Sequence, residues 1–169
     1  NFRDSKIDSF ISAAEKLAEM GYTVFRMGAV VEKPLESSHP NVIDYATNGM
    51  RTEFLDIYLG AHCTFCVSNS NGFDAVPRIF KRPLLICDEA IYFESSHLAL
   101  HTVHYPKIIK EQSNESQLSL RETINRGIAN SHQSANFEDA GVEIRDLSSE
   151  ELVEAVTEMA QRVEGTFVE

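Results

Sequence analysis

Apolar residues recur along the chain in two alternating patterns, one typical of helices and one typical of buried strands. Positions 7, 10, 11, 14, 17 and 18 are apolar at helical spacing, and Gly21 then ends the predicted helix. Residues 22–27 are predicted to form a strand that ends before Gly28, and residues 41–45 a second, shorter strand. Helical spacing resumes over residues 50–62.

The middle of the chain continues this alternation. Residues 63–67 and 84–87 are apolar at nearly every position, as expected for strands that are covered on both faces. The polar run 68–72 lies between the first of these strands and a short helix. We expect the longer helix to present one apolar face (Phe54, Ile57, Tyr58, Ala61) and the short helix to bury one stripe (Phe73, Val76, Ile79, Phe80).

The pattern weakens over residues 88–115, a long connection with one possible strand at 103–109. Ser119 with Glu122, and Ser148 with Glu151, have the spacing of a capping box, so each pair is expected to open a helix. A short helix at 133–140 and a strand at 142–145 are predicted between those two helices. The final helix should bury Leu152, Val156, Met159 and Val163.

Strands that alternate with helices predict a mixed α/β fold, here one Rossmann-like domain with a largely parallel sheet and helices on both faces. A length of 169 residues fits a single domain with its own core. The first residue is not Met, and no apolar leader follows it, so we expect the chain to be cut from a longer protein.

Charge excludes one class of partner. The net charge is −11, and residues 132–169 alone contain ten acidic and two basic residues. Such a surface disfavours binding to nucleic acid. No apolar stretch is long enough to cross a membrane.

Cysteine and histidine spacing gives no metal site. Cys63 and Cys66 are three apart in a predicted strand, where they point to opposite faces, and no second pair exists to complete a zinc site. His97, His101 and His104 have helical spacing, but no carboxylate or thiol is in register with them. We therefore predict no metal and treat the thiols as buried apolar groups.

Parallel sheets bind ligands outside the carboxyl ends of their strands, which selects the loops after residues 27, 43, 67 and 87. The most informative of them contains Ser68, Asn69, Ser70, Asn71 and Gly72. Its hydroxyls, amides and N–H groups at the start of a helix suit a diphosphate. The same residues also fit an ordinary strand-to-helix turn with an Asn cap.

Two charged residues are placed at other strand ends. Arg26 could meet phosphate or carboxylate there, or be a surface residue at a sheet edge. Asp44 could accept hydrogen bonds from a ribose or base, or only from a turn or helix cap.

Several segments together resemble a family of bacterial glycosyltransferases linked to surface-polysaccharide loci. They are residues 43–46, 54–59, 66–76 and 80–83, with 2–5 and 22–28 near the beginning and 140–144 and 165–166 near the end. The resemblance covers nearly the whole chain, and the segments follow one another in the same order as in the family. The layout is also similar to the C-terminal half of heptosyltransferases and other GT-B enzymes. One departure is that Asn69 or Asn71 stands where the family loop often has a second glycine.

The resemblance implies a half-enzyme that binds a nucleotide-sugar donor without a cofactor or metal, while a preceding domain holds the acceptor. By position, Ser68, Ser70, Asn71 and Gly72 would face the diphosphate, with Asn69 in the same loop. Arg26 and Gly28 would line the donor cleft, Asp44 would lie near the nucleoside, and Arg3 would reach the phosphates. The implied location is cytoplasmic, with the full protein associated peripherally at the inner face of the bacterial membrane. No catalytic residue can be assigned.

Two alternatives remain open. A GT-B-shaped sugar-nucleotide epimerase would share the cleft but needs a catalytic carboxylate and histidine. A non-catalytic nucleotide-binding or receiver-like module would need an acidic cluster with a late lysine. Asp44 and Asp88 lie at predicted strand ends, but no matching Lys follows residues 84–87.

Overall fold

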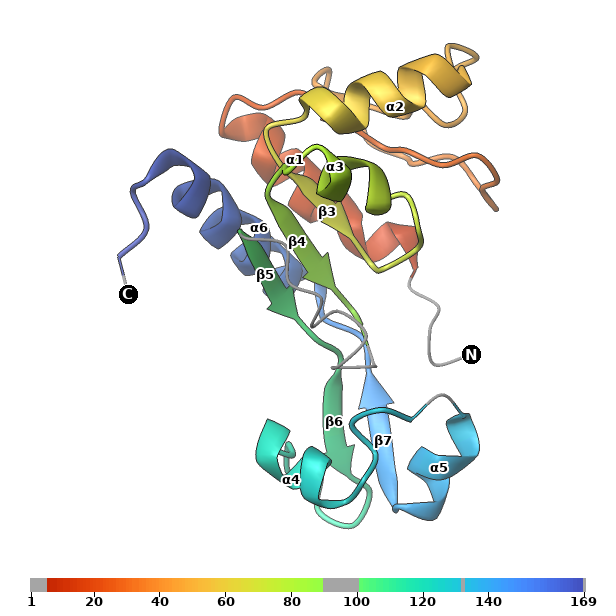
Figure 1. Cartoon of the computed structure of the whole chain (residues 1–169), viewed down its shortest axis with the longest axis vertical. Helices are drawn as coiled ribbons and strands as arrows, with labels where there is room; N and C mark the ends of the chain where they lie inside the picture. Colours follow the sequence, from red (N-terminus) through yellow and green to blue (C-terminus); the bar gives the residue numbers. More distant parts are fainter. Residues whose placement is uncertain (1–5, 90–100, 132, 169) are drawn as a thin grey trace.

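The computed structural model of the chain describes residues 6–89, 101–131 and 133–168. They form a larger main lobe and a smaller distal lobe, residues 108–145, which projects from one end of it (Figure 1). The elements of the main lobe are the 3-10 helix η1 (Ile7–Phe10), α1 (Ile11–Glu19), β1 (Val24–Phe25), β2 (Val42–Ile43), α2 (Glu53–His62), β3 (Cys66–Ser68), α3 (Ala75–Ile79), β4 (Leu84–Cys87), β5 (Thr102–Tyr105) and α6 (Ser149–Glu164). Those of the distal lobe are β6 (Ile108–Glu111), α4 (Leu120–Asn125), α5 (Ser134–Asp139) and β7 (Val142–Arg145).

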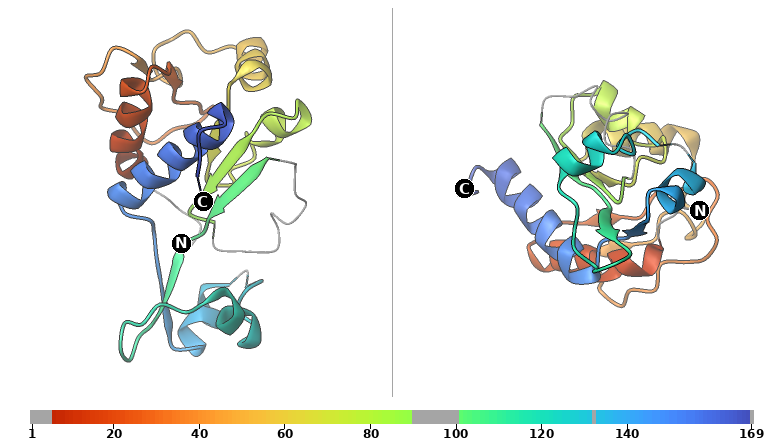
Figure 2. Two further views of the ribbon diagram at one scale, coloured as in Figure 1. Left: turned by 90° about the vertical axis from the view of Figure 1, so that its left-hand side faces the viewer. Right: turned by 90° about the horizontal axis from the view of Figure 1, so that it is seen from below.

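The strands of the main lobe are parallel. β1 pairs with β2, and β4 lies between β3 and β5, with Ser68 opposite Ile86 and Ile86 opposite His104. Helices α1 and α6 pack together on one face of these strands, and α2 and α3 lie on the other (Figures 1 and 2). The predicted α/β class with parallel strands and helices on both faces is confirmed, although the parallel sheets are small.

The main core lies between β4 and the α1–α6 pair. Leu85 and Cys87 of β4 pack with Leu17 of α1 and with Leu152 and Met159 of α6. Helix α6 forms here because the predicted capping box is present at Ser148 and Glu151 and because Gly165 ends the helix with a φ of 72°. The buried positions of α6 recur every three or four residues, which aligns them on one face.

The distal lobe has a different architecture. β6 and β7 are antiparallel, with Ile108 opposite Arg145 and Glu111 opposite Val142. A second hydrophobic cluster covers one side of this ribbon, and its buried members are Ile109, Leu118, Ile128, Phe137 and Val142. The capping box predicted at Ser119 and Glu122 opens α4. The strand pairing is therefore parallel in the main lobe and antiparallel in the distal lobe.

Two local predictions are wrong. The single strand expected at 103–109 is two strands, β5 and β6, because Pro106 and Lys107 interrupt the run. Ile79 and Phe80 were expected inside, but they are 75% and 49% exposed. Helix α3 ends at Ile79, so it is too short to bury a long stripe.

Candidate functional site

The predicted ligand loops lie at the carboxyl ends of the parallel strands. Ser68 ends β3 and Asp88 follows β4, the neighbouring strand. Tyr22 and Phe65, which precede β1 and β3, make an edge-to-face ring contact with centroids 5.5 Å apart. This contact indicates that β1 and β3 start side by side. We call the carboxyl ends of the parallel strands, β1 with β2 and β3 with β4 and β5, the carboxyl edge of the main lobe.

Arg26 and Asp44 are brought together at this edge. Nη1 of Arg26 donates to Oδ1 of Asp44 at 3.1 Å, and Nη2 donates to the carbonyl of Lys33 at 3.3 Å. The other carboxylate oxygen of Asp44 accepts from the Leu35 amide at 2.9 Å and the Thr47 hydroxyl at 2.6 Å. Both residues thus hold the loop between β1 and β2 closed.

The electrostatics of Asp44 follow from these contacts. Burial raises the pKa of Asp44, but hydrogen bonds from Thr47, Leu35 and Arg26 stabilise the charged form and leave the pKa below its usual value. Because both oxygens of Asp44 accept hydrogen bonds from the protein, its capacity to recognise a nucleoside is reduced. Its role as a turn carboxylate, one of the two interpretations of the sequence, is present in the fold.

Gly28 occupies a crowded position beside this pair. Its φ is +153°, and a Cβ atom there would lie 2.6 Å from Cγ1 of Val31. Backbone conformation and space both require glycine. Gly28 therefore allows the close turn after β1.

Backbone amides in and just after the loop from Ser68 to Gly72 are hydrogen-bonded by neighbouring side chains. The buried Ser68 hydroxyl accepts from the Ser70 amide at 3.1 Å, and Oδ1 of Asn71 accepts from the Phe73 amide at 3.2 Å. The Gly72 amide donates to Oδ1 of Asp74 at 3.1 Å. Three amides that could face an anion thus have acceptors within the loop.

The start of α3 is less favourable to an anion than its sequence indicated. Asp74 lies at the N-terminus, is buried, and pairs with Arg78 at 2.7 Å. Helix α3 has five residues, so its dipole is small. Side chains that remain exposed in the loop belong to Ser70 and Asn71, with Asn69 half-buried. Ser70 has a left-handed backbone, with φ of 64°.

Of the buried charges next to the carboxyl edge, Asp88 was singled out from the sequence, but Glu89 and Lys107 were not. Asp88 accepts from the Leu147 amide at 2.7 Å, and Lys107 pairs with Asp146. Glu89 is buried, and its Oε2 lies 3.6 Å from Nδ1 of His104. These contacts join the end of β4 to the two segments that lead into and out of the distal lobe. The sequence signal for these buried charges was the position of two acids, Asp88 and Glu89, directly after the apolar strand at 84–87.

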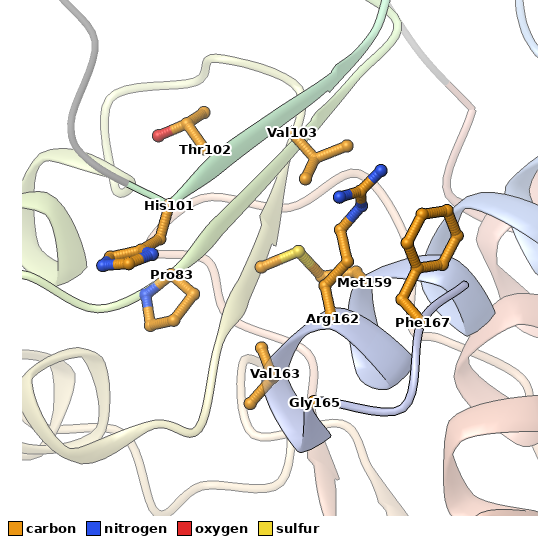
Figure 3. Close-up of a pocket in the computed structure, with 9 residues that line it drawn as sticks. All are labelled: Pro83, His101, Thr102, Val103, Met159, Arg162, Val163, Gly165 and Phe167. Carbon is orange, nitrogen blue, oxygen red and sulfur yellow. The ribbon is translucent and has the colours of Figure 1, made fainter. Parts of the chain in front are cut away.

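A depression lies at the opposite edge of the sheet, where β4 and β5 begin. It has a volume of about 810 Å³ and is lined by His101, Val103, Met159, Arg162 and Phe167, among others. Figure 3 shows the guanidinium of Arg162 beside the ring of Phe167, and the two are 3.9 Å apart. None of the residues predicted to bind the donor lines this depression.

Some predicted residues fall outside the described part of the chain, namely Arg3 and His97. His101 and His104 are separated, since His101 lines the depression and His104 faces Glu89. Within residues 6–89, 101–131 and 133–168, no three His, Cys, Asp or Glu side chains are arranged to hold a metal ion. The cysteines are free, and burial raises the pKa of Cys66 to about 12.

Comparison of the chain with family models, curated proteins and solved structures finds no match. None of the helices in the described residues is long and apolar enough to cross a membrane.

Proposed function

We propose that the chain is the donor-binding half of a glycosyltransferase, which transfers a sugar from a nucleoside diphosphate to a surface glycan or a lipid-linked acceptor. The observation that carries the proposal is the position of the Ser68–Gly72 loop at the carboxyl end of β3, while the Arg26–Asp44 pair joins the segments that follow β1 and β2. Open parallel sheets bind ligands at the carboxyl ends of their strands. The order of segments that resemble surface-polysaccharide glycosyltransferases supports the same function.

In this proposal the diphosphate is held mainly by side chains of the loop. Ser70 and Asn71 are exposed and have polar atoms to offer, whereas Asp74 weakens the attraction of the α3 N-terminus for an anion. Arg26 would supply a positive charge, although part of it is neutralised by Asp44. Binding by these groups would stabilise the leaving diphosphate electrostatically.

The rest of the proposal concerns partners. A preceding domain would hold the acceptor and supply the catalytic base. The full protein would act in the cytoplasm, associated peripherally with the inner face of the bacterial membrane. No step requires a cofactor, since the nucleotide sugar is a substrate.

The test is thermal denaturation of the chain with UDP, GDP, ADP, CMP and their sugar conjugates. A ligand that binds only the folded state at 100 times its Kd stabilises it by about 2.7 kcal/mol. For a chain of this size, each kcal/mol shifts Tm by about 2–4 °C. We expect one nucleoside diphosphate to raise Tm clearly above the others.

Ser70→Asp and Ser70→Asn form a matched pair of variants. Asn and Asp both tolerate the left-handed backbone of Ser70, but only Asp adds a negative charge beside the diphosphate. We expect the nucleotide response to be lost in Ser70→Asp and kept in Ser70→Asn. The same response in both variants, or no nucleotide effect at millimolar concentration on the folded protein, would contradict the proposed site.

A sugar-nucleotide epimerase is the second candidate, because Glu89 and His104 form a carboxylate–imidazole pair beside the carboxyl edge. Such a pair can move a proton to and from a sugar carbon. Incubation of the full-length protein with the stabilising nucleotide sugar, followed by NMR of the product, separates the two. An epimeric sugar nucleotide favours the epimerase, and a transferred sugar favours the transferase.

A further inference from the structure

The depression between the end of α6 and the amino ends of β4 and β5 has a lining that favours an anion. Its volume of about 810 Å³ falls in the range of roughly 300–1,000 Å³ that is typical of ligand pockets. The chain has 26 acidic and 15 basic residues, but the described residues that line the depression include Arg162 and His101 and no acid. An anion that enters it therefore meets an arginine without a carboxylate in the lining.

A second depression, on the distal lobe, has a different lining. Its volume is about 350 Å³, and it is lined by three glutamates, two cations and one glutamine. Mixed charges without apolar side chains are typical of a solvated face. The depression beside α6 differs in both respects, because its lining has no acid and is partly apolar.

The apolar walls of the depression come from the sheet, from α6 and from the segment after α6. Val103 belongs to β5, Met159 and Val163 belong to α6, and Phe167 follows the helix. Met159 is buried and is part of the main core, so this wall is held rigidly. Figure 3 shows these side chains on one side of the depression, with His101 on the other. An apolar group of a ligand would therefore be covered from several directions.

Contacts within the chain fix the guanidinium of Arg162 among these walls (Figure 3). Its Nε donates to Oε1 of Glu158 at 2.6 Å, and its Cζ lies 3.9 Å from the centroid of the Phe167 ring. In the part of the chain that the structure describes, neither Nη atom of Arg162 donates a hydrogen bond to the protein. Since 38% of the side chain is exposed, a ligand can reach both Nη atoms.

We propose that this depression binds a small carboxylate that carries an apolar group. The two Nη atoms of Arg162 form a planar fork that matches both oxygens of a carboxylate. The apolar group lies against Val103, Val163 and Phe167, where it loses contact with water. Because Glu158 already neutralises part of the charge of Arg162, a singly charged carboxylate fits better than a doubly charged phosphate ester.

His101 adds a polar contact on the other side of the depression. Its backbone is left-handed, with a φ of 74°, and its carbonyl accepts from the Leu84 amide at 3.1 Å. Residues other than glycine adopt this conformation infrequently, and they gather at ligand sites. A ring nitrogen of His101 is thus held where it can bond to a second polar group of the ligand.

The proposed carboxylate site does not depend on nucleotide binding. It lies at the amino ends of the strands, whereas the Ser68–Gly72 loop follows the carboxyl end of β3. The two sites therefore share no residue, and each can be tested without the other.

The test is a titration of the isotope-labelled chain with phenylbutyrate, followed by NMR of the backbone amides. We expect the largest shifts at Thr102, Val163 and Gly165, and none at Ser70 or Gly72. The neutral phenylbutyramide should bind roughly tenfold or more weakly, because it lacks the charge that strengthens hydrogen bonds to Arg162. Acetate should also bind more weakly, because it has too little apolar surface to bury.

Two variants of α6 should change the affinity for phenylbutyrate in opposite directions. Arg162→Gln removes the fork and its charge, and should weaken binding by roughly tenfold or more. Glu158→Gln removes the competing charge but keeps an oxygen that can accept from Arg162, so it should strengthen binding by roughly threefold. Arg121→Gln is the matched control, because Arg121 is exposed on α4 of the distal lobe. It should bind as the unchanged chain does.

The opposite directions separate the proposal from a general effect on folding, which would weaken binding in both variants. The proposal is overturned if millimolar phenylbutyrate leaves the amides of Thr102, Val163 and Gly165 unshifted. Equal binding of phenylbutyrate and phenylbutyramide also overturns it, as does unchanged affinity in folded Arg162→Gln. Weaker binding by folded Glu158→Gln would contradict the role given to Arg162.

Discussion

The two lobes are built from the same chain but differ in how much core supports each element. In the main lobe, two helices and a strand that is buried on both faces share one cluster, and Leu85 and Leu152 are fully buried within it. In the distal lobe, a two-stranded ribbon is covered by two six-residue helices, and Phe137 is the one aromatic among the buried members of its cluster. Short isolated helices are only marginally stable. The stability of the small lobe therefore depends on few contacts, and each of them contributes a larger share than a contact in the main lobe does.

The largest effect is expected from Leu152→Ala. Leu152 is fully buried between α6 and the sheet, so its truncation should lower the free energy of unfolding by about 2–5 kcal/mol. Urea denaturation followed by circular dichroism measures this loss. Ile124→Ala, at an exposed position of α4, should change stability little.

Phe137→Ala is the corresponding change in the distal lobe. We expect it to speed hydrogen exchange at β6 and β7 while β4 stays protected, because the distal cluster is separate from the main one. Its effect on the global transition should be smaller than that of Leu152→Ala. Equal loss of protection in β4 would show that the lobes unfold as a single unit.

The two capping boxes allow a finer comparison. Ser148→Ala and Ser119→Ala remove the same type of hydrogen bond, from Glu151 N in α6 and from Glu122 N in α4. Each cap contributes about 1 kcal/mol. We expect Ser148→Ala to lower global stability by that amount, and Ser119→Ala to increase exchange only in the distal lobe. Exchange data for both variants test this, and a global loss in Ser119→Ala would remove the distinction.

The smallest effect concerns pH at the boundary between the lobes. Both Nη atoms of Arg145 donate to Glu151 at 2.8 Å, and this contact is the main cause that lowers the pKa of Glu151 to about 2. A lowered carboxyl pKa gives stability that is present above the unfolded pKa and is lost as pH falls towards 2. About a third of each side chain is exposed, so the contribution should stay below about 1 kcal/mol.

Urea denaturation of Glu151→Gln across this pH range measures the contribution. The variant should lose less stability than the unchanged chain between about pH 5 and about pH 2. Parallel pH curves for the two proteins would mean that the pair adds nothing measurable.

The elements that local sequence determines were the ones predicted best. The strand at 84–87 and the strand at 142–145 have the expected bounds, and both capping boxes formed. Apolar runs and cap spacing act within a few residues, so they can be recognised without knowing the fold. The antiparallel pairing of β6 with β7 joins residues such as Ile108 and Arg145, and nothing in local periodicity indicates it.

The candidate site was predicted in position but not in detail. The loops at 28, 44 and 68–72 follow strands as expected. Side chains such as Asp74 accept hydrogen bonds from amides of the loop, so they decide which amides remain available to a ligand. The spacing of residues in the sequence does not reveal these contacts. The exposure of Ile79 was missed because helical periodicity describes a face without saying what covers it.

The distal lobe also has a topological consequence. The chain leaves the main lobe after Tyr105 and returns at Asp146, and Ile108 and Arg145 lie opposite each other on neighbouring strands. Departure and return are therefore adjacent, which makes the whole excursion an insertion between β5 and α6. The main lobe could be closed by a short turn in its place, so the excursion can vary in length and sequence without changing the parallel strands. The path of the backbone thus allows this region to be exchanged as a unit.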